Sequence, residues 1–302
     1  MANYLKLLIS AAILGFLIYK VDFAAVTQTI LGADWLLLGL ALMFLIASQL
    51  VAAYRWSLIM GLLSYSHPLI FYVKSYFKGA MFNQVLPTSI GGDAYRVAEV
   101  KSQGGRLREA FYGVFIDRIV GLIGLLLITL VANMIDPSLL PTEIFYLVNG
   151  LILAAFLGFF VLLALHKLPL LERWSFTKLF FDLSQRFRLV YKTPKRISQQ
   201  LGLSVLIHLL AMIAIFGIGH SVGINEPLVT YLVLIPPAIL LTVLPLSFAG
   251  WGLREGALIF LFMSVGIDAT LVLAMSILYG IMLIFAALPG LVFYVRNKHK
   301  IL

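Results

Sequence analysis

Residues 86–96 read LPTSIGGDAYR and interrupt an apolar stretch that extends over residues 69–95. A second apolar stretch, residues 228–266, contains the similar sequence LPLSFAGWGLR at residues 244–254. The two sequences share Leu-Pro, a serine two residues after the proline, a glycine five after it and an arginine nine after it. Proline and glycine end or kink helices, so neither stretch is predicted to cross a membrane as one plain helix. We expect two broken or re-entrant helix hairpins.

The chain as a whole is strongly apolar. It has 302 residues, of which 62% are hydrophobic and 12% charged, with a mean hydropathy of +1.04. Soluble domains have about 25% charged residues, and a membrane-spanning helix needs about 20 apolar residues. The composition predicts an all-α polytopic membrane protein with one membrane domain over residues 1–302 and about six to eight transmembrane helices. Six plain spans are expected at residues 4–20, 35–62, 110–133, 143–166, 199–222 and 271–295.

The distribution of basic residues predicts the orientation in the cell membrane. Eight basic and two acidic residues lie in residues 167–196, and Lys101, Arg106 and Arg108 mark another basic loop. Basic loops face the cytoplasm, which places both termini on that side. Residues 167–198 form a linker in which aromatic and basic residues alternate, so we expect an amphipathic helix at the cytoplasmic surface. The net charge of +9 then suits anionic lipid headgroups, and we expect no nucleic-acid partner.

If the spans cross the membrane alternately in chain order, with both termini in the cytoplasm, the two similar turns have opposite orientations. The first turn enters from the cytoplasm and the second from outside. Spans at residues 35–62 and 110–133 flank the first, and spans at residues 199–222 and 271–295 flank the second. Residues 35–133 and 199–295 therefore form two predicted repeat units with inverted topology, a plan common in transporters.

Ionisable residues inside apolar segments are costly and are candidates for function. Glycines next to them can let a phosphate approach the backbone, and an arginine one turn later can bind its oxygens. On these grounds the candidate substrate-binding residues are Arg55, Lys74, Lys78, Asn83, Ser89, Gly91, Gly92, Asp93, Arg96, Asp117, Arg118, Ser247, Gly250, Gly252, Arg254 and Glu255. Cations exceed anions among them, which favours an anionic ligand.

Structural roles are compatible with the same residues. Asp117 with Arg118, and Arg254 with Glu255, are equally suited to ion pairs with other helices. Arg55, Lys74 and Lys78 are long enough to extend to the membrane surface, and the glycines suit tight helix packing. His208, inside an apolar span, is expected to be a packed or hydrogen-bonded histidine.

Sequence signatures of enzyme chemistry are missing. The chain has no cysteine, no zinc-binding histidine pair, no Walker loop and no nucleophile elbow. We expect no catalytic residue, no metal and no cofactor, and hence a protein that is not an enzyme.

The motifs resemble those of the lysylphosphatidylglycerol synthase transmembrane-region family, also called flippase-like membrane proteins. The resemblance rests on the sequences NQVLP at residues 83–87, GGDAYR at residues 91–96 and DR with Gly121 at residues 117–121. It also rests on LPLS at residues 244–247, GWGLREG at residues 250–256 and Arg55 with Trp56. The resemblance implies a membrane domain that moves lipids or lipid-linked molecules between leaflets. In the best-known relatives a C-terminal synthase domain makes the aminoacylated lipid, and this sequence ends at Leu302 without one.

Three functions are compatible with the sequence. The first is a flippase or transporter for an anionic phospholipid, an aminoacyl-phospholipid or a lipid-linked molecule. The second is a polytopic enzyme acting on a lipid-linked substrate, and the third is a non-catalytic membrane partner of a separate lipid synthase. The expected partners are membrane lipids with anionic or phosphate-bearing headgroups. A homo-oligomer and a complex with a lipid-modifying enzyme are both compatible with the sequence.

Overall fold

The computed structural model describes residues 15, 22–86, 91–168, 170, 175–243 and 252–298. Within these residues the chain forms eleven α-helices and one short 3-10 helix, and it forms no strand. The helices are α2 (Phe23–Leu31), α3 (Trp35–Leu62), α4 (Leu69–Val85), α5 (Gly91–Ser102), α6 (Leu107–Ile135), α7 (Thr142–Ala164), η1 (Leu165–Lys167), α8 (Ser175–Val190), α9 (Pro194–Ser221), α10 (Leu228–Val243), α11 (Leu253–Met263) and α12 (Ala269–Lys298). The predicted all-α class is confirmed.

Five helices are long and apolar enough to cross a membrane: α3, α6, α7 with η1, α9 and α12. They correspond to the five predicted spans that begin at residues 35, 110, 143, 199 and 271. The sixth predicted span, residues 4–20, lies outside the described residues apart from Gly15. These five spans confirm a polytopic membrane protein.

Each interrupted apolar stretch contains two helices, as its turn motif predicts. The first consists of α4 and α5, and the second consists of α10 and α11. Residues 87–90 and 244–251, which include both Leu-Pro turns, lie outside the described residues. Before the start of α11, Gly252 is its N-cap, and its φ of +88° is a conformation that favours glycine.

Capping residues fix where the two central helices begin. The Asp34 carboxylate accepts hydrogen bonds from the backbone N–H groups of Leu36 and Leu37 at the start of α3. Pro194 opens α9 after Thr193, whose side chain accepts a hydrogen bond from the Arg196 N–H. These caps satisfy N–H groups that have no partner inside their own helix.

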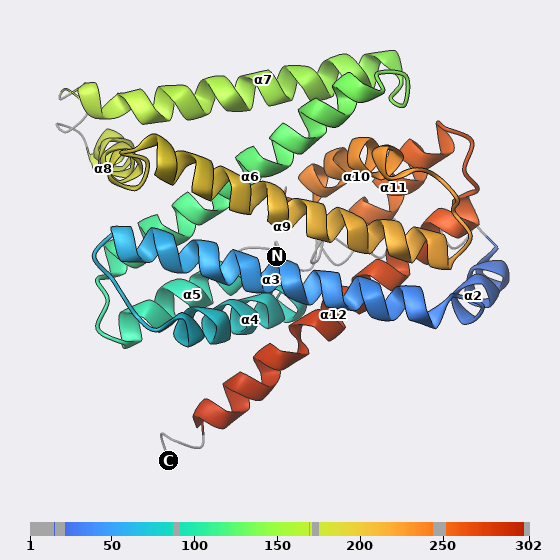
Figure 1. Cartoon of the computed structure of the whole chain (residues 1–302), viewed down its shortest axis with the longest axis horizontal. Coiled ribbons are helices and arrows are strands. Elements are labelled where there is room, and N and C mark those ends of the chain that lie inside the picture. Colours follow the sequence, from blue (N-terminus) through green and yellow to red (C-terminus); the bar gives the residue numbers. More distant parts are fainter. Residues whose placement is uncertain are drawn as a thin grey trace.

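The helices α3 and α9 run side by side and antiparallel through the middle of the molecule (Figure 1). The Asp34 N–H, at the start of α3, donates to the Ser221 carbonyl at the end of α9, 3.0 Å away. Around this pair, α4 packs against α12 and α6 packs against α10. If residues 35–133 are exchanged with residues 199–295, the α3–α9 pairing maps onto itself, and the α4–α12 pairing maps onto the α6–α10 pairing. By contrast, α7 lies at the edge of the bundle (Figure 1).

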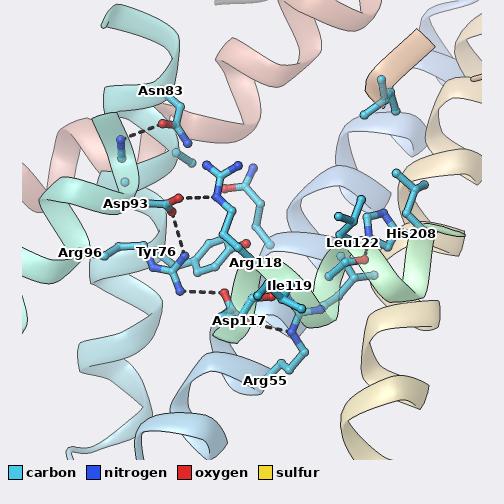
Figure 2. A pocket seen from close by; sticks show the side chains of 18 of the residues that line it. Arg55, Tyr76, Asn83, Asp93, Arg96, Asp117, Arg118, Ile119, Leu122 and His208 are labelled. Atoms are coloured by element: carbon cyan, nitrogen blue, oxygen red, sulfur yellow. Dashed lines mark hydrogen bonds and ion pairs between the residues drawn. The ribbon is translucent and has the colours of Figure 1, made fainter. Parts of the chain in front are cut away.

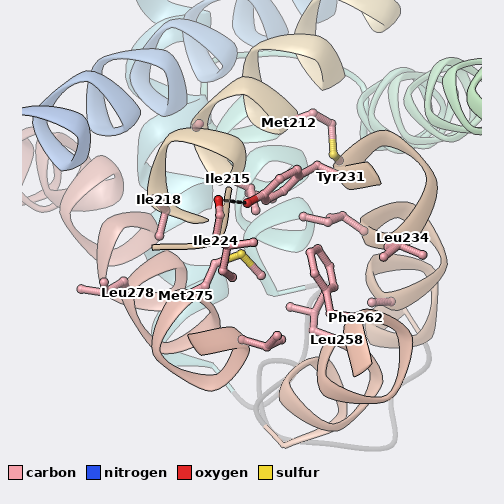
Figure 3. Packing of buried hydrophobic residues seen from close by; sticks show 14 of the residues in the cluster. Met212, Ile215, Ile218, Ile224, Tyr231, Leu234, Leu258, Phe262, Met275 and Leu278 are labelled. Carbon is pink, nitrogen blue, oxygen red and sulfur yellow. Dashed lines mark hydrogen bonds between the residues drawn. The ribbon is translucent and has the colours of Figure 1, made fainter. Parts of the chain in front are cut away.

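The largest buried cluster lies mostly among α9, α10, α11 and α12 (Figure 3) and also includes residues of α2, α3 and α6. Met212 and Ile215 of α9 pack there with Tyr231, Phe262 and Met275, all of them almost fully buried. The Tyr231 hydroxyl donates to the Ile224 carbonyl at 3.4 Å, which satisfies its one polar group. The second half of the chain therefore has a continuous apolar core.

The predicted linker contains α8, which uses much of its apolar face against the protein. Leu183, Phe187 and Val190 are buried against α3 and α6, while Leu189 remains exposed. Arg186 forms an ion pair with Glu109 at the start of α6, 2.7 Å away. The helix is thus fixed to the bundle by protein contacts, in addition to the membrane-surface role that the sequence predicts.

Candidate functional site

A cavity of about 530 Å³ lies among the helices α3, α4, α5, α6, α9, α10 and α12 (Figure 2). Its polar side chains come mainly from α3 to α6: Gln49, Arg55, Tyr76, Asn83, Gln84, Asp93, Arg96, Asp117 and Arg118. Its apolar side chains come from α6, α9, α10 and α12: Ile119, Leu122, Leu125, Ile207, Ile239, Leu240 and Leu283. Figure 2 shows Asn83, Asp93 and Arg96 on one side and Leu122 and His208 on the other. The cavity is therefore amphipathic.

Asp117 is the centre of the charged side. Its Oδ1 accepts from Arg55 Nε at 2.9 Å, and its Oδ2 accepts from Arg96 Nη2 at 2.8 Å. The Asp117 carbonyl accepts a further hydrogen bond from Arg55 Nη2 at 3.0 Å. All three side chains are almost fully buried. One carboxylate thus joins α3, α5 and α6, because a buried charge needs close partners of opposite sign.

Arg96 is held on several sides. Its guanidinium stacks between the rings of Trp56 and Tyr76, 4.1 and 4.7 Å from their centroids, and its Nη1 donates to Asp93 at 3.3 Å. Its buried Nε has no hydrogen-bond partner. Buried donors are nearly always paired in proteins, so an acceptor that entered the cavity would satisfy this group.

Arg118 is the most accessible of the cavity arginines. It forms an ion pair with Asp93, yet 38% of its side chain remains exposed, compared with 4% for Arg55. Three arginines and two aspartates line the cavity, which leaves a formal surplus of one positive charge. Arg118 is the cation best placed to meet a ligand.

Seven of the candidate residues predicted from the sequence line this cavity: Arg55, Asn83, Gly92, Asp93, Arg96, Asp117 and Arg118. Lys74, Lys78, Gly91, Gly252, Arg254 and Glu255 are not among its described lining residues, and Ser89, Ser247 and Gly250 lie outside the described residues. Lys78 is buried in an ion pair with Glu99, and the Lys74 Nζ lies 6.0 Å from the centre of the Phe293 ring. The two lysines therefore have separate partners.

The arginine of the second turn forms a separate buried network. Arg254 Nη2 donates to Glu255 at 2.5 Å, and its Nε lies 3.2 Å from the Ser276 hydroxyl of α12. The other Glu255 oxygen accepts from the Gly252 N–H at 2.6 Å. Arg254 and Glu255 thus form an ion pair with each other within α11, whereas the sequence suited them to ion pairs with other helices; hydrogen bonds to Ser276 connect them to α12.

Gly92 allows α5 to pack closely against α4. Its N–H donates to Asn83 Oδ1 at 2.7 Å, and a Cβ added at Gly92 would lie 2.1 Å from the Gly79 carbonyl oxygen. This contact brings Asn83, Asp93 and Arg96 to the cavity, since close packing of small residues sets helix positions.

We therefore expect Gly92→Ala to separate α4 from α5 and to destabilise the protein by roughly 1–3 kcal/mol. Thermal unfolding of the purified protein in detergent measures the effect. The matched control is Gly202→Ala in α9, where an added Cβ meets nothing within 4 Å and a small gain in stability is expected. Equal unfolding temperatures for the two variants would contradict this role of Gly92.

Several lining residues were not identified from the sequence: Gln49, Tyr76, Gln84, Gly121 and His208. His208 Nε2 lies 2.8 Å from the Gly121 carbonyl oxygen, so the predicted hydrogen-bonded histidine is confirmed, but the same ring lines the cavity. Gln49 and Tyr76 carry no charge, and only the packing of α3 and α4 brings them to this site. A neutral polar residue within a span is the one signal that could have found them.

No curated protein matches the chain significantly. A family model described as lysylphosphatidylglycerol synthase TM region matches residues 3–290, which is nearly the whole chain and includes every residue of the cavity. The chain therefore belongs to the lysylphosphatidylglycerol synthase TM region family.

Proposed function

We propose that this protein moves phospholipids with an anionic headgroup between the two leaflets of the cell membrane. The observation that carries the proposal is the amphipathic cavity, whose charged side and apolar side lie among membrane-spanning helices. A phospholipid has the same division between a charged headgroup and apolar chains. A sugar or a free ion would leave the apolar side of the cavity without a partner.

The charges of the cavity favour a headgroup with one negative charge. The formal surplus is one positive charge, and Arg118 and the Arg96 Nε are donors that a phosphodiester oxygen can use. The apolar residues Leu122, Ile239 and Leu283 provide contacts for acyl chains. An aminoacylated phosphatidylglycerol keeps this phosphodiester and could use the same donors, but its ammonium groups cancel the negative charge, so it matches the surplus positive charge less well.

The pairings of α4 with α12 and of α6 with α10 support movement of a lipid between the two sides of the membrane. If residues 35–133 and 199–295 form inverted repeats, exchange of their conformations would open the cavity alternately to each leaflet. The pairings of α4 with α12 and of α6 with α10 are the contacts that such an exchange would interchange. Both termini are placed in the cytoplasm in this proposal.

The two carboxylates of the cavity suit this function better than acid–base catalysis. Both oxygens of Asp117 already accept from arginines, and Asp93 pairs with Arg96 and Arg118. A general base needs a carboxylate oxygen within reach of the proton that it removes.

Reconstitution into vesicles tests the proposal. The purified protein is expected to transfer fluorescent phosphatidylglycerol between leaflets, measured by reduction of the outer-leaflet dye, faster than protein-free vesicles do. Leu122→Trp is expected to slow the transfer severalfold, because the indole occupies part of the cavity. Leu147→Trp in α7, a position that is 62% exposed, is the matched control. Transfer equal to that of empty vesicles, for every anionic lipid tested, would refute the proposal.

A further inference from the structure

A second pocket, of about 390 Å³, lies between the C-terminal end of α3 and the N-terminal end of α9. It shares no lining residue with the charged cavity, and its described lining includes Arg196 and His67 but no carboxylate. In the predicted orientation these helix ends face the cytoplasm. The pocket is therefore a separate, positively charged site at that membrane surface.

One wall of the pocket contains an unsatisfied buried acceptor. Gln200 is only 1% exposed, and its Oε1 has no hydrogen-bond partner. One turn later, Ser204 donates to the Gln200 carbonyl at 2.8 Å and accepts from Arg55 at 2.7 Å, which fixes this part of α9. Buried acceptors are nearly always paired, so a ligand that donates a hydrogen bond would complete this wall.

Arg196 supplies the charge one turn before Gln200. Its Nη1 donates to the Leu189 carbonyl at 3.1 Å, which positions the side chain at the corner between α8 and α9. A guanidinium has five N–H donors, so others remain for a ligand. The positive end of the α9 dipole adds to the attraction for an anion.

Ring contacts hold the loop that carries His67. The His67 ring packs against Tyr65 and Phe71, 4.7 and 4.8 Å from their ring centres, and these two rings also contact each other. The Tyr72 hydroxyl donates to the Tyr65 carbonyl at 2.8 Å and so holds this loop against α4. A preformed wall lowers the entropic cost of binding a ligand.

We propose that this pocket binds a phosphodiester headgroup that carries a hydroxyl or ammonium donor. Arg196 contacts the phosphate oxygens, and Gln200 Oε1 accepts the hydrogen bond from the hydroxyl or ammonium group. Leu58, Leu62 and the partly exposed Leu69 form an apolar side of the pocket, which suits the glycerol and the first carbons of the acyl chains of a lipid. The site is independent of lipid movement through the charged cavity.

Native mass spectrometry of the purified full chain, titrated with lipid in detergent, tests the proposal. Phosphatidylglycerol and phosphatidylethanolamine are expected to bind this pocket roughly tenfold more tightly than phosphatidylcholine, whose quaternary ammonium cannot donate a hydrogen bond. Arg196→Gln and Gln200→Leu are each expected to remove one bound lipid per chain. Lys195→Gln, which removes the same charge from an exposed neighbouring position outside the pocket, is expected to keep it.

Stability distinguishes a ligand site from a structural role. Gln200→Leu removes an unsatisfied acceptor, so its unfolding temperature is expected to equal or exceed that of the wild type without lipid. A lower temperature, unchanged lipid binding in the two variants, or equal binding of phosphatidylcholine would each overturn the proposal.

Two further comparisons distinguish a soluble ligand from a membrane lipid, and this pocket from the charged cavity. Binding of deacylated glycerophosphoglycerol with the affinity of the lipid would identify a soluble ligand, and binding of the lipid alone would identify a membrane lipid. The two sites can also be distinguished. If the charged cavity binds no lipid, the wild type is still expected to bind one lipid in the second pocket, and Arg196→Gln is expected to lose that lipid.

Discussion

Asp117→Asn is expected to lower the free energy of unfolding by about 3–5 kcal/mol, the cost of breaking a buried ion pair by removing one partner. Asp117 is 2% exposed, and its carboxylate forms an ion pair with each of Arg55 and Arg96. Without its charge, two buried guanidinium groups remain near each other. Thermal unfolding in detergent, followed by tryptophan fluorescence, measures the loss.

Two controls make this result specific. Asp136→Asn removes the same charge from the half-buried C-cap of α6. Asparagine keeps the Oδ1 that accepts from Ser138, so stability is expected to change by less than about 0.5 kcal/mol. The double variant Arg55→Gln with Asp117→Asn is expected to lose less free energy of unfolding than the sum of the losses of the two single variants. The reason is that Arg55→Gln removes one of the two buried charges that Asp117→Asn leaves without a carboxylate partner. Additive losses would show that the pair is not coupled.

Arg118→Gln is expected to reduce lipid transfer by roughly tenfold to a hundredfold with little change in stability, a loss equivalent to one or two strong charge-assisted hydrogen bonds. The Arg118 side chain is partly exposed in the cavity, and its partner Asp93 keeps its ion pair with Arg96. The initial rate of phosphatidylglycerol transfer in reconstituted vesicles measures this effect.

The control for Arg118 is Arg108→Gln, at the start of the same helix. Arg108 is 67% exposed and lies outside the described cavity lining, so its loss is expected to leave the transfer rate unchanged. Equal rates for Arg118→Gln and the wild type would remove Arg118 from the site. A large fall in its unfolding temperature would assign it a structural role instead.

The two similar turns show where sequence reasoning succeeds and where it stops. Their shared arginines, Arg96 and Arg254, have the same place in the motif, but only Arg96 lines the charged cavity. Arg96 has a carboxylate partner on another helix, Asp117, while Arg254 pairs with its own neighbour Glu255. The sequence predicts that loss of either arginine impairs function with folding intact. The burial of Arg96 among Asp117, Trp56 and Tyr76 now predicts a loss of stability as well.

The sequence by itself determined the membrane class, five spans of the described chain and the two interruptions, because hydropathy and the backbone effects of proline and glycine act over short distances along the chain. It also indicated the charged residues at the cavity, since an ionisable group in a span needs a reason to be there. Only the tertiary structure decided which charges pair. The partners Arg55 and Asp117 are 62 residues apart, and the apolar side of the cavity combines residues of α6 with residues of α9, α10 and α12 from the other half of the chain. Helix packing alone brings them together.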